Sequence, residues 1–161
     1  MTADDYNRCV DNCADGLYRF MIKHVRDTEI ARDLVQDAFA KVWVKHADID
    51  PDKAKSYLFS TGYHTMIDHV RRAKKQGNFE EADPMSFSDH SQYTDLNEVL
   101  HRALDRLPEV QKSVILLRDY EGYSYAEIGT ICGLSEAQVK VYIFRGRKTL
   151  KEYIGKVENL V

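Results

Sequence analysis

The amino-acid sequence predicts an all-α protein: two small helical modules joined by an acidic linker, with a helix-turn-helix in the C-terminal module. Apolar residues recur at helical intervals along most of the chain, whereas the alternation typical of strands is weak everywhere. Between Gln76 and Leu100 there is no Lys or Arg, and six acidic residues accumulate among Gly, Pro, Ser and Thr, a composition typical of linkers. Near the C-terminus, two capping boxes follow one another across a Gly-Leu-Ser corner. We therefore expect modules over residues 1–75 and 95–161, with the linker over residues 76–94.

Composition and charge narrow the class of protein. The 161 residues suffice for one domain or two small ones, and they are 43% hydrophobic and 30% charged with a formal net charge of −3. Because the whole chain is slightly acidic, any surface that binds nucleic acid must be a local basic patch. No apolar run approaches the roughly 18 residues that a membrane span needs, and no signal-peptide pattern opens the chain. We expect a cytoplasmic protein without direct membrane insertion.

The cysteines predict neither a disulfide framework nor a metal site. Cys9, Cys13 and Cys132 are an odd number in a reducing compartment, so we expect free thiols. Cys9 and Cys13 could offer two zinc ligands, but no second His/Cys pair with metal spacing completes a set, and ordinary helix packing explains their spacing better. The residues indicate no metal and no cofactor.

The first module should contain three or four helices. Residues 31–46 carry one broad apolar stripe that we expect to pack inward, against a partner helix over residues 17–25; its members are Leu34, Val35, Ala38, Phe39, Val42 and Trp43. Polar residues lie around the stripe and are interpreted from the pattern alone as a solvated face: Asp33, Gln36, Asp37 and Lys41. A loop around Pro51 leads to the next helix.

The helix predicted over residues 55–75 has a narrow buried seam of Met66, Ile67 and Val70. Three aromatic residues, Tyr57, Phe59 and Tyr63, precede a run of cations formed by Arg71, Arg72, Lys74 and Lys75. Aromatic rings that stack on unpaired bases and cations that follow phosphates are what single-strand binding needs. Core aromatics beside a solvated basic end are the alternative. His64, Asp68 and His69 cannot converge on one metal ion without a bend, because neighbouring helical residues lie about 100° apart.

The C-terminal module carries the clearest motif. Ser124 with Glu127 and Ser135 with Gln138 predict helix starts at 124 and 135, and Gly133 can take the left-handed conformation that ends the first helix. The result is a helix-turn-helix. Upstream, Leu96, Leu100, Ala103 and Leu107 form one apolar seam, and Pro108 opens a helix that carries Val110, Val114 and Leu117.

The second helix of this motif should have two different faces. Val139, Ile143, Gly146 and Leu150 lie within about 60° of arc and should face the module core. The opposite face mixes apolar residues with cations: Ala137, Val141, Phe144, Arg145 and Lys148, flanked by Lys140 and Lys151. Such a face suits the DNA major groove, where apolar atoms meet thymine methyl groups and cations meet guanine or phosphate. A merely basic surface helix is the alternative.

Three segments together resemble a known family: "ARDLVQDAFAKVW", "MIDHVRRAKK" and "LDRLPEVQKSVILLRDYEGYSYAEIGTICGLSEAQVKVYIFRGRKTLK". They are similar to the two conserved regions of extracytoplasmic-function (ECF) sigma factors of bacterial RNA polymerase, and the resemblance runs from about residue 10 to 155. It implies a dissociable initiation subunit without catalytic residues. Its partners would be polymerase core enzyme, promoter DNA and an anti-sigma factor, which can be membrane-anchored.

The resemblance also implies which residues make these contacts. The polymerase core would be bound by Asp33, Gln36, Asp37 and Lys41. The minus-ten element would be bound by Tyr57, Phe59, Tyr63, His64, Asp68, Arg71 and Arg72. The minus-thirty-five element would be bound by Lys140, Val141, Phe144, Arg145, Arg147 and Lys148.

The sequence departs from the family pattern in two places. Where the family commonly has W-L-x-R-I-A-x-N, this chain has "YLFSTGYH", in which Gly62 weakens the helix by about 1 kcal/mol relative to alanine. Val141 and Tyr142 replace a usual Ser-Arg pair, which removes one cation.

Two other classes of protein explain less of the chain. A helix-turn-helix regulator that acts without polymerase would leave the helix around Asp37 unexplained, and an enzyme acting on nucleic acid would need a catalytic constellation that the sequence does not contain.

Overall fold

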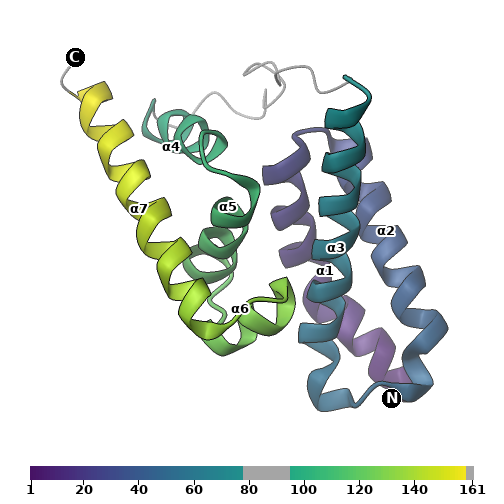
Figure 1. Cartoon of the computed structure of the whole chain (residues 1–161). Helices are drawn as coiled ribbons and strands as arrows, with labels where there is room; N and C mark the ends of the chain where they lie inside the picture. Colours follow the sequence, from purple (N-terminus) through teal and green to yellow (C-terminus); the bar gives the residue numbers. More distant parts are fainter. Residues whose placement is uncertain (78–94, 159–161) are drawn as a thin grey trace. The chain divides into compact units, whose positions relative to one another are not determined.

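The computed structural model describes residues 1–77 and 95–158, without the side chains of residues 95, 96, 157 and 158. All regular structure in these residues is helical, which confirms the predicted all-α class (Figure 1). The chain divides into two compact units, one built mainly from α1 to α3 and the other mainly from α4 to α7. The predicted linker lies, from residue 78 onward, outside the described residues.

The first unit is a bundle of three helices that pack against one another: α1 (Ala3–Val25), α2 (Thr28–Lys45) and α3 (Ala54–Lys75). Two short 3-10 turns, η1 (His46–Asp48) and η2 (Pro51–Lys53), connect α2 to α3. Each helix contributes fully buried side chains to the core, among them Leu17, Met21, Ala31, Ala38, Leu58 and Met66. The helix that the sequence predicted over residues 17–25 is longer and begins at Ala3.

Local sequence explains where these helices begin. At α1, the Thr2 hydroxyl accepts a hydrogen bond from Asp5 N–H, and the Asp5 carboxylate accepts one from Thr2 N–H, which is a complete capping box. At α2, the Asp27 carboxylate accepts hydrogen bonds from the N–H groups of Glu29 and Ile30. These side chains satisfy backbone donors that the first turn of a helix leaves unpaired.

At Gly62, the backbone of α3 lies close to side chains of α1. A Cβ atom at this position would lie 2.7 Å from Cδ1 of the buried Leu17 and 3.1 Å from Cε of Met21. The glycine that weakens the helix in isolation therefore permits the close packing of the two helices, and its low helix propensity is offset by tertiary contact.

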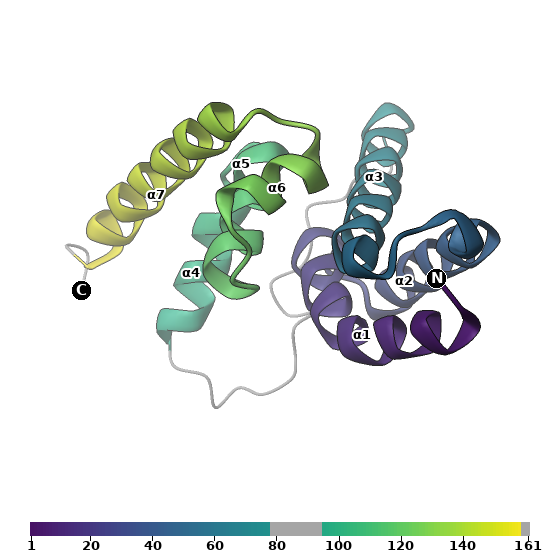
Figure 2. The ribbon, with the colours of Figure 1, turned by 90° about the horizontal axis from the view of Figure 1, so that it is seen from below.

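The second unit contains α4 (Asp95–Asp105), α5 (Glu109–Ile115), α6 (Tyr125–Cys132) and α7 (Glu136–Glu158), with a π-helical turn, η4 (Leu116–Tyr120), continuing α5. The long helix α7 packs along α4 and α5 (Figure 2). At Gly146 its backbone comes so close to α5 that a Cβ atom would collide with Cδ1 of Ile115. The four helices predicted for this module are confirmed. Among the helices described, none combines the length and the apolar character needed to cross a membrane.

Candidate nucleic-acid and partner interfaces

The helix-turn-helix forms as the sequence predicts. Ser124 N–H donates to Glu127 Oε1 at 3.0 Å and Glu127 N–H donates to Ser124 Oγ at 3.1 Å, so the first capping box is reciprocal. Ser135 and Gln138 repeat this arrangement at 2.9 and 3.1 Å. Between the boxes, Gly133 ends α6 with φ of 70°, the left-handed conformation that glycine adopts without strain. Local hydrogen bonds therefore fix both the start of α7 and the corner before it.

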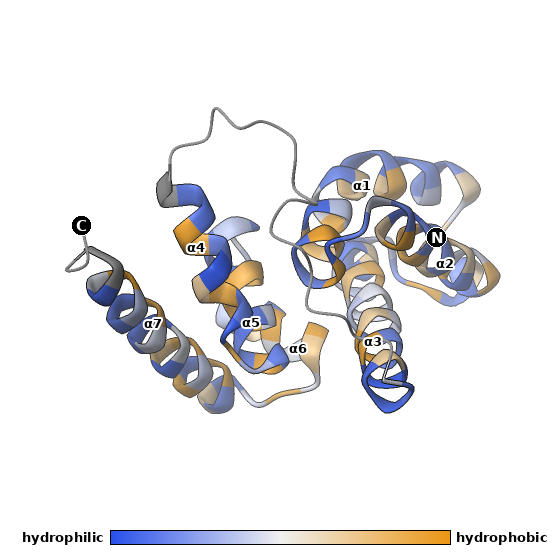
Figure 3. Ribbon diagram, turned by 90° about the horizontal axis from the view of Figure 1, so that it is seen from above, coloured by the Kyte–Doolittle hydropathy of each residue, from blue (hydrophilic) through white to orange (hydrophobic). Residues whose placement is uncertain are grey.

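The two predicted faces of α7 are also present. Val139, Ile143, Gly146 and Leu150 are buried in the unit core. On the opposite side Val141 is 44% exposed and Phe144 is 70% exposed, among exposed Ala137, Lys140, Arg145 and Lys148. Hydrophilic and hydrophobic residues alternate along the α7 ribbon as this division requires (Figure 3). Phe144 and Val141 thus place apolar surface beside cations on one exposed side of α7.

The cations of α7 have different surroundings. Arg147 donates to both carboxylate oxygens of Asp119, with Nη2 2.6 Å from Oδ1 and Nε 3.3 Å from Oδ2, and this hydrogen bonding raises the pKa of the guanidinium. Lys140 Nζ lies 5.6 Å from the centre of the Tyr125 ring, which Arg118 also approaches at 4.5 Å. Within the described residues, neither the Arg145 nor the Lys148 side chain has an ion-pair partner. Of Lys140, Arg145, Arg147 and Lys148, Arg147 is the one with an ion-pair partner among the described residues.

Five of the seven residues predicted to bind the minus-ten element share one exposed side of α3. At about 100° per residue they lie within roughly 60° of the direction of Tyr57, and they are Tyr57, His64, Asp68, Arg71 and Arg72. The Tyr57 side chain is 37% exposed. The C-terminal end of α3, with its cations, forms a continuous hydrophilic stretch (Figure 3). The structure thus brings one aromatic ring and a basic helix end to the same surface.

The prediction is wrong for Phe59 and Tyr63. Phe59 is 2% exposed and lies edge-on to Phe20 of α1, and Tyr63 is 5% exposed. Both point away from the side of α3 that carries Tyr57, because their helical positions differ from it by more than 100°. Buried rings cannot stack on an unpaired base, so the alternative of core aromatics holds for these two residues.

The residues predicted to bind the polymerase core form an exposed row on α2, while Leu34 and Ala38 are buried behind them. The row is Asp33, Gln36, Asp37 and Lys41. Lys41 Nζ lies 3.3 Å from Asp37 Oδ2 and donates to Thr65 Oγ1 of α3 at 3.1 Å. These two contacts hold the Lys41 ammonium beside the Asp37 carboxylate, so this part of the row presents a positive and a negative charge side by side.

The prediction for Trp43 is also wrong. Predicted to pack inward, it is 45% exposed and stacks on His46 of η1, with ring centres 4.0 Å apart and planes 8° apart. The Tyr6 ring of α1 meets it edge-on at 4.9 Å. Trp43 lies about 110° from the centre of the buried side of α2, at the border of the apolar stripe, where periodicity does not decide burial.

Comparisons with known proteins identify the family. Residues 9–76 match the model of sigma-70 region 2 and residues 97–150 match the model of sigma-70, region 4. The chain is 28% identical to the ECF RNA polymerase sigma factor SigM of Bacillus subtilis, with 99% of both chains covered. It is 29% identical to RNA polymerase sigma factor SigV of Bacillus subtilis, over 92% of this chain and 90% of that protein.

Solved structures agree with this result. The sigma factor RpoE of Bartonella quintana, in complex with the anti-sigma factor NepR, matches with a TM-score of 0.80 and 26% identity over 95% of this chain and 98% of that chain. CnrH, in complex with the cytosolic domain of CnrY, has the same fold, with a TM-score of 0.71 at 24% identity. With a match to sigma-70 region 2 followed by a match to region 4, and with relatives covered over almost their whole length, the chain belongs to the ECF sigma factors of bacterial RNA polymerase.

Proposed function

We propose that this sigma factor divides promoter recognition between its two units. The first unit binds the polymerase core through α2 and the minus-ten element through α3, and the second unit binds the minus-thirty-five element through α7. The protein acts in the cytoplasm as a dissociable subunit of RNA polymerase, where the polymerase and the chromosome are, and has no catalytic role of its own.

The exposed apolar pair on α7 carries this proposal most directly. Phe144 is 70% exposed and Val141 is 44% exposed, on the side of α7 that also carries Arg145 and Lys148. The second helix of a helix-turn-helix places such a side in the major groove, where a thymine methyl group can cover the apolar atoms. Arg145 can donate to a guanine edge, while Lys140 and Lys148 can approach phosphates. Arg147, paired with Asp119, is assigned a structural role instead.

On α3, Tyr57 is the ring we propose for stacking on an unpaired base of the minus-ten element. Arg71 and Arg72 can follow the phosphates of the same strand, and Arg72 Nε already donates to Asp68 O at 3.3 Å. His64 and Asp68 lie between the ring and the cations on this side of the helix, where the Asp68 carboxylate could accept a hydrogen bond from a cytosine amino group. One strand could therefore run along the helix from Tyr57 to Arg72.

The row on α2 is proposed to bind the polymerase core, by the family resemblance and by its exposure. We also propose that an anti-sigma factor holds the chain inactive, because the Bartonella quintana relative was solved with one. An anti-sigma factor need not cover the whole chain, since blocking either the α2 row or the α7 face would prevent initiation.

The test is binding of the upstream element by polymerase holoenzyme. Transcript sequencing after overexpression would first define the promoter. Phe144→Ala should then weaken binding to the minus-thirty-five element by up to about 2 kcal/mol, because a ring that DNA would cover is lost. Lys156→Ala removes an exposed cation further along α7 and serves as the control. Equal binding by Phe144→Ala and wild type, at unchanged melting temperature, would contradict the assignment of α7.

A further inference from the structure

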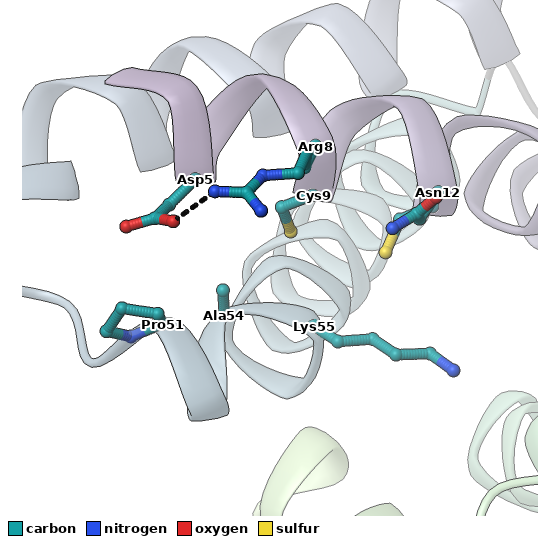
Figure 4. Close-up of a pocket in the computed structure, with 8 residues that line it drawn as sticks. Asp5, Arg8, Cys9, Asn12, Pro51, Ala54 and Lys55 are labelled. Carbon is teal, nitrogen blue, oxygen red and sulfur yellow. Dashed lines mark hydrogen bonds and ion pairs between the residues drawn. The ribbon is translucent and has the colours of Figure 1, made fainter. Parts of the chain in front are cut away.

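A pocket of about 260 Å³ lies in the first unit between α1 and the segment that begins α3 (Figure 4). Cys9 and Cys13, one helical turn apart on α1, both line it, and Pro51 and Ala54 form the opposite wall. Cys9 is half-buried and Cys13 is buried, and both are free thiols. Nothing in promoter or polymerase binding, as proposed above, uses these two thiols.

We propose that Cys9 is a reactive thiol, the site at which a disulfide of an anionic low-molecular-weight thiol adds to this sigma factor. The Cys9 thiolate attacks one sulfur of the small disulfide, a new sulfur–sulfur bond forms, and the other half leaves as a thiolate that takes up a proton. The small disulfide is the oxidant, and an excess of the free thiol reverses the reaction by the same exchange. The proposal does not depend on the assignment of the DNA-binding faces.

The surroundings of Cys9 favour its thiolate. The neighbouring Cys13 thiol, one turn along α1, lowers the pKa of Cys9 to about 7, although partial burial opposes the shift. The same pairing raises the pKa of Cys13, which therefore stays protonated and keeps its role as donor. The thiolate is the form that attacks disulfides, so a fraction of Cys9 that is large for a cysteine is reactive at neutral pH.

Charges beside the pocket favour an anionic reagent. Arg8 on α1 and Lys55 on α3 line it, and the Lys55 charge favours ionisation of the neighbouring Cys13. Asp5 also lines the pocket, but its carboxylate is paired with Arg8 at 2.9 Å. Asp5, Arg8, Lys55 and the Cys9 thiolate are the charged groups of α1 and α3 that line the pocket. A disulfide that carries carboxylates can approach Lys55 as it reacts with Cys9.

The geometry of α1 prevents the simplest competing product, a disulfide between Cys9 and Cys13. Cβ atoms four residues apart on a helix are about 5–6 Å apart, whereas a disulfide needs them at roughly 3.5–4.5 Å. Cys13 therefore cannot displace the added group to form a Cys9–Cys13 disulfide unless α1 unwinds at this turn. The mixed disulfide should persist.

The first experiment treats the full chain with oxidised glutathione at neutral pH and follows it by intact-mass measurement and peptide mapping. We expect one adduct, on Cys9, which Cys9→Ser abolishes. Cys132 supplies an internal control, because burial raises its pKa to about 12, and Cys132→Ser should leave the adduct unchanged. No adduct on Cys9, equal labelling of Cys132, or loss of two hydrogens without an adduct would overturn the proposal.

A second measurement tests the role of Cys13. The rate at which iodoacetamide alkylates Cys9 should rise with pH around a midpoint near 7. Cys13→Ala should move this midpoint toward the roughly 8.5 of an ordinary cysteine, whereas Cys13→Ser, which keeps a hydrogen-bond donor, should leave it lower. Circular dichroism checks that each variant is folded. The same midpoint in wild type and in folded Cys13→Ala would contradict the role of Cys13.

The charge of the reagent is tested with Lys55→Ala. Wild type should react several-fold faster with oxidised glutathione than Lys55→Ala does, and cystamine, a cationic disulfide, should show no such loss. If both reagents respond equally to the substitution, the pocket does not select an anionic thiol.

Discussion

Arg147 and Lys148 are neighbouring cations on α7 that the protein treats differently. The Arg147 guanidinium donates to both oxygens of Asp119, whereas the Lys148 side chain has no ion-pair partner within the described residues. A cation that must leave an internal partner to reach a phosphate gains less from DNA than one that is exposed and unpaired. We therefore propose a structural role for Arg147 and a DNA-binding role for its neighbour Lys148.

This difference gives a prediction for the pair of alanine variants. Lys148→Ala should weaken holoenzyme binding to all upstream sequences alike and reduce the salt dependence by about one counterion. Arg147→Ala should leave the salt dependence closer to wild type and lower the melting temperature slightly, since an exposed ion pair contributes at most about 1 kcal/mol. Binding measured at several salt concentrations, together with thermal melting, separates the two. Identical salt slopes for both variants would show that Arg147 also releases a counterion.

At the scale of the helix, α3 carries one exposed and one buried aromatic side chain within three residues. Tyr57 is exposed on the side that carries the cations, and Phe59 is buried against α1. We propose that the exposed ring meets an unpaired base, whereas the buried ring packs in the core of the first unit.

Alanine substitution should therefore lower single-strand affinity at Tyr57 and stability at Phe59. Tyr57→Ala should cost about 1 to 3 kcal/mol of single-strand affinity with little change in melting temperature. Phe59→Ala should instead destabilise the first unit by about 3 to 5 kcal/mol, the usual cost of removing a buried ring. Permanganate footprinting of promoter opening and thermal melting on each variant make the comparison. A Tyr57→Ala variant that opens the promoter like wild type would contradict the proposed role of α3.

The row on α2 leads to a prediction about polymerase. Asp37→Arg reverses one exposed charge and breaks a half-exposed ion pair with Lys41, which contributes no more than about 0.5 kcal/mol in a helix. Core affinity should fall while the melting temperature stays close to wild type. Asp15→Arg makes the same charge change at an exposed site on α1 and is the control. If Asp37→Arg co-elutes with core polymerase as well as Asp15→Arg does, Asp37 is not part of the interface.

Across the whole molecule, the features that the sequence predicted best are those that depend on near neighbours. The helix-turn-helix rests on two capping boxes and one left-handed glycine, all within residues 124–138, and the structure reproduces each of them. The exposed face of α7 follows from helical period alone. Such features need no knowledge of the rest of the fold.

The features that escaped prediction depend on distant partners. Phe59 is buried because Phe20 of α1 covers it, and Gly62 is needed because Leu17 passes beside it. Arg147 is held by Asp119, which is 28 residues away in the sequence. Trp43 lies at the border of the apolar stripe, where the positions of η1 and α1 decide how far the ring is covered. Charge and periodicity specify none of these pairings.

As an ECF sigma factor, this chain directs RNA polymerase to a promoter as a subunit of the enzyme. The most direct measurement combines the purified chain with core polymerase, follows co-elution, and then assays transcription from the promoter defined by transcript sequencing. We expect the chain to co-elute with the core and to make initiation at that promoter depend on its presence. A chain that fails to bind the core, yet binds the promoter equally well alone, would contradict the claim and identify a helix-turn-helix regulator instead.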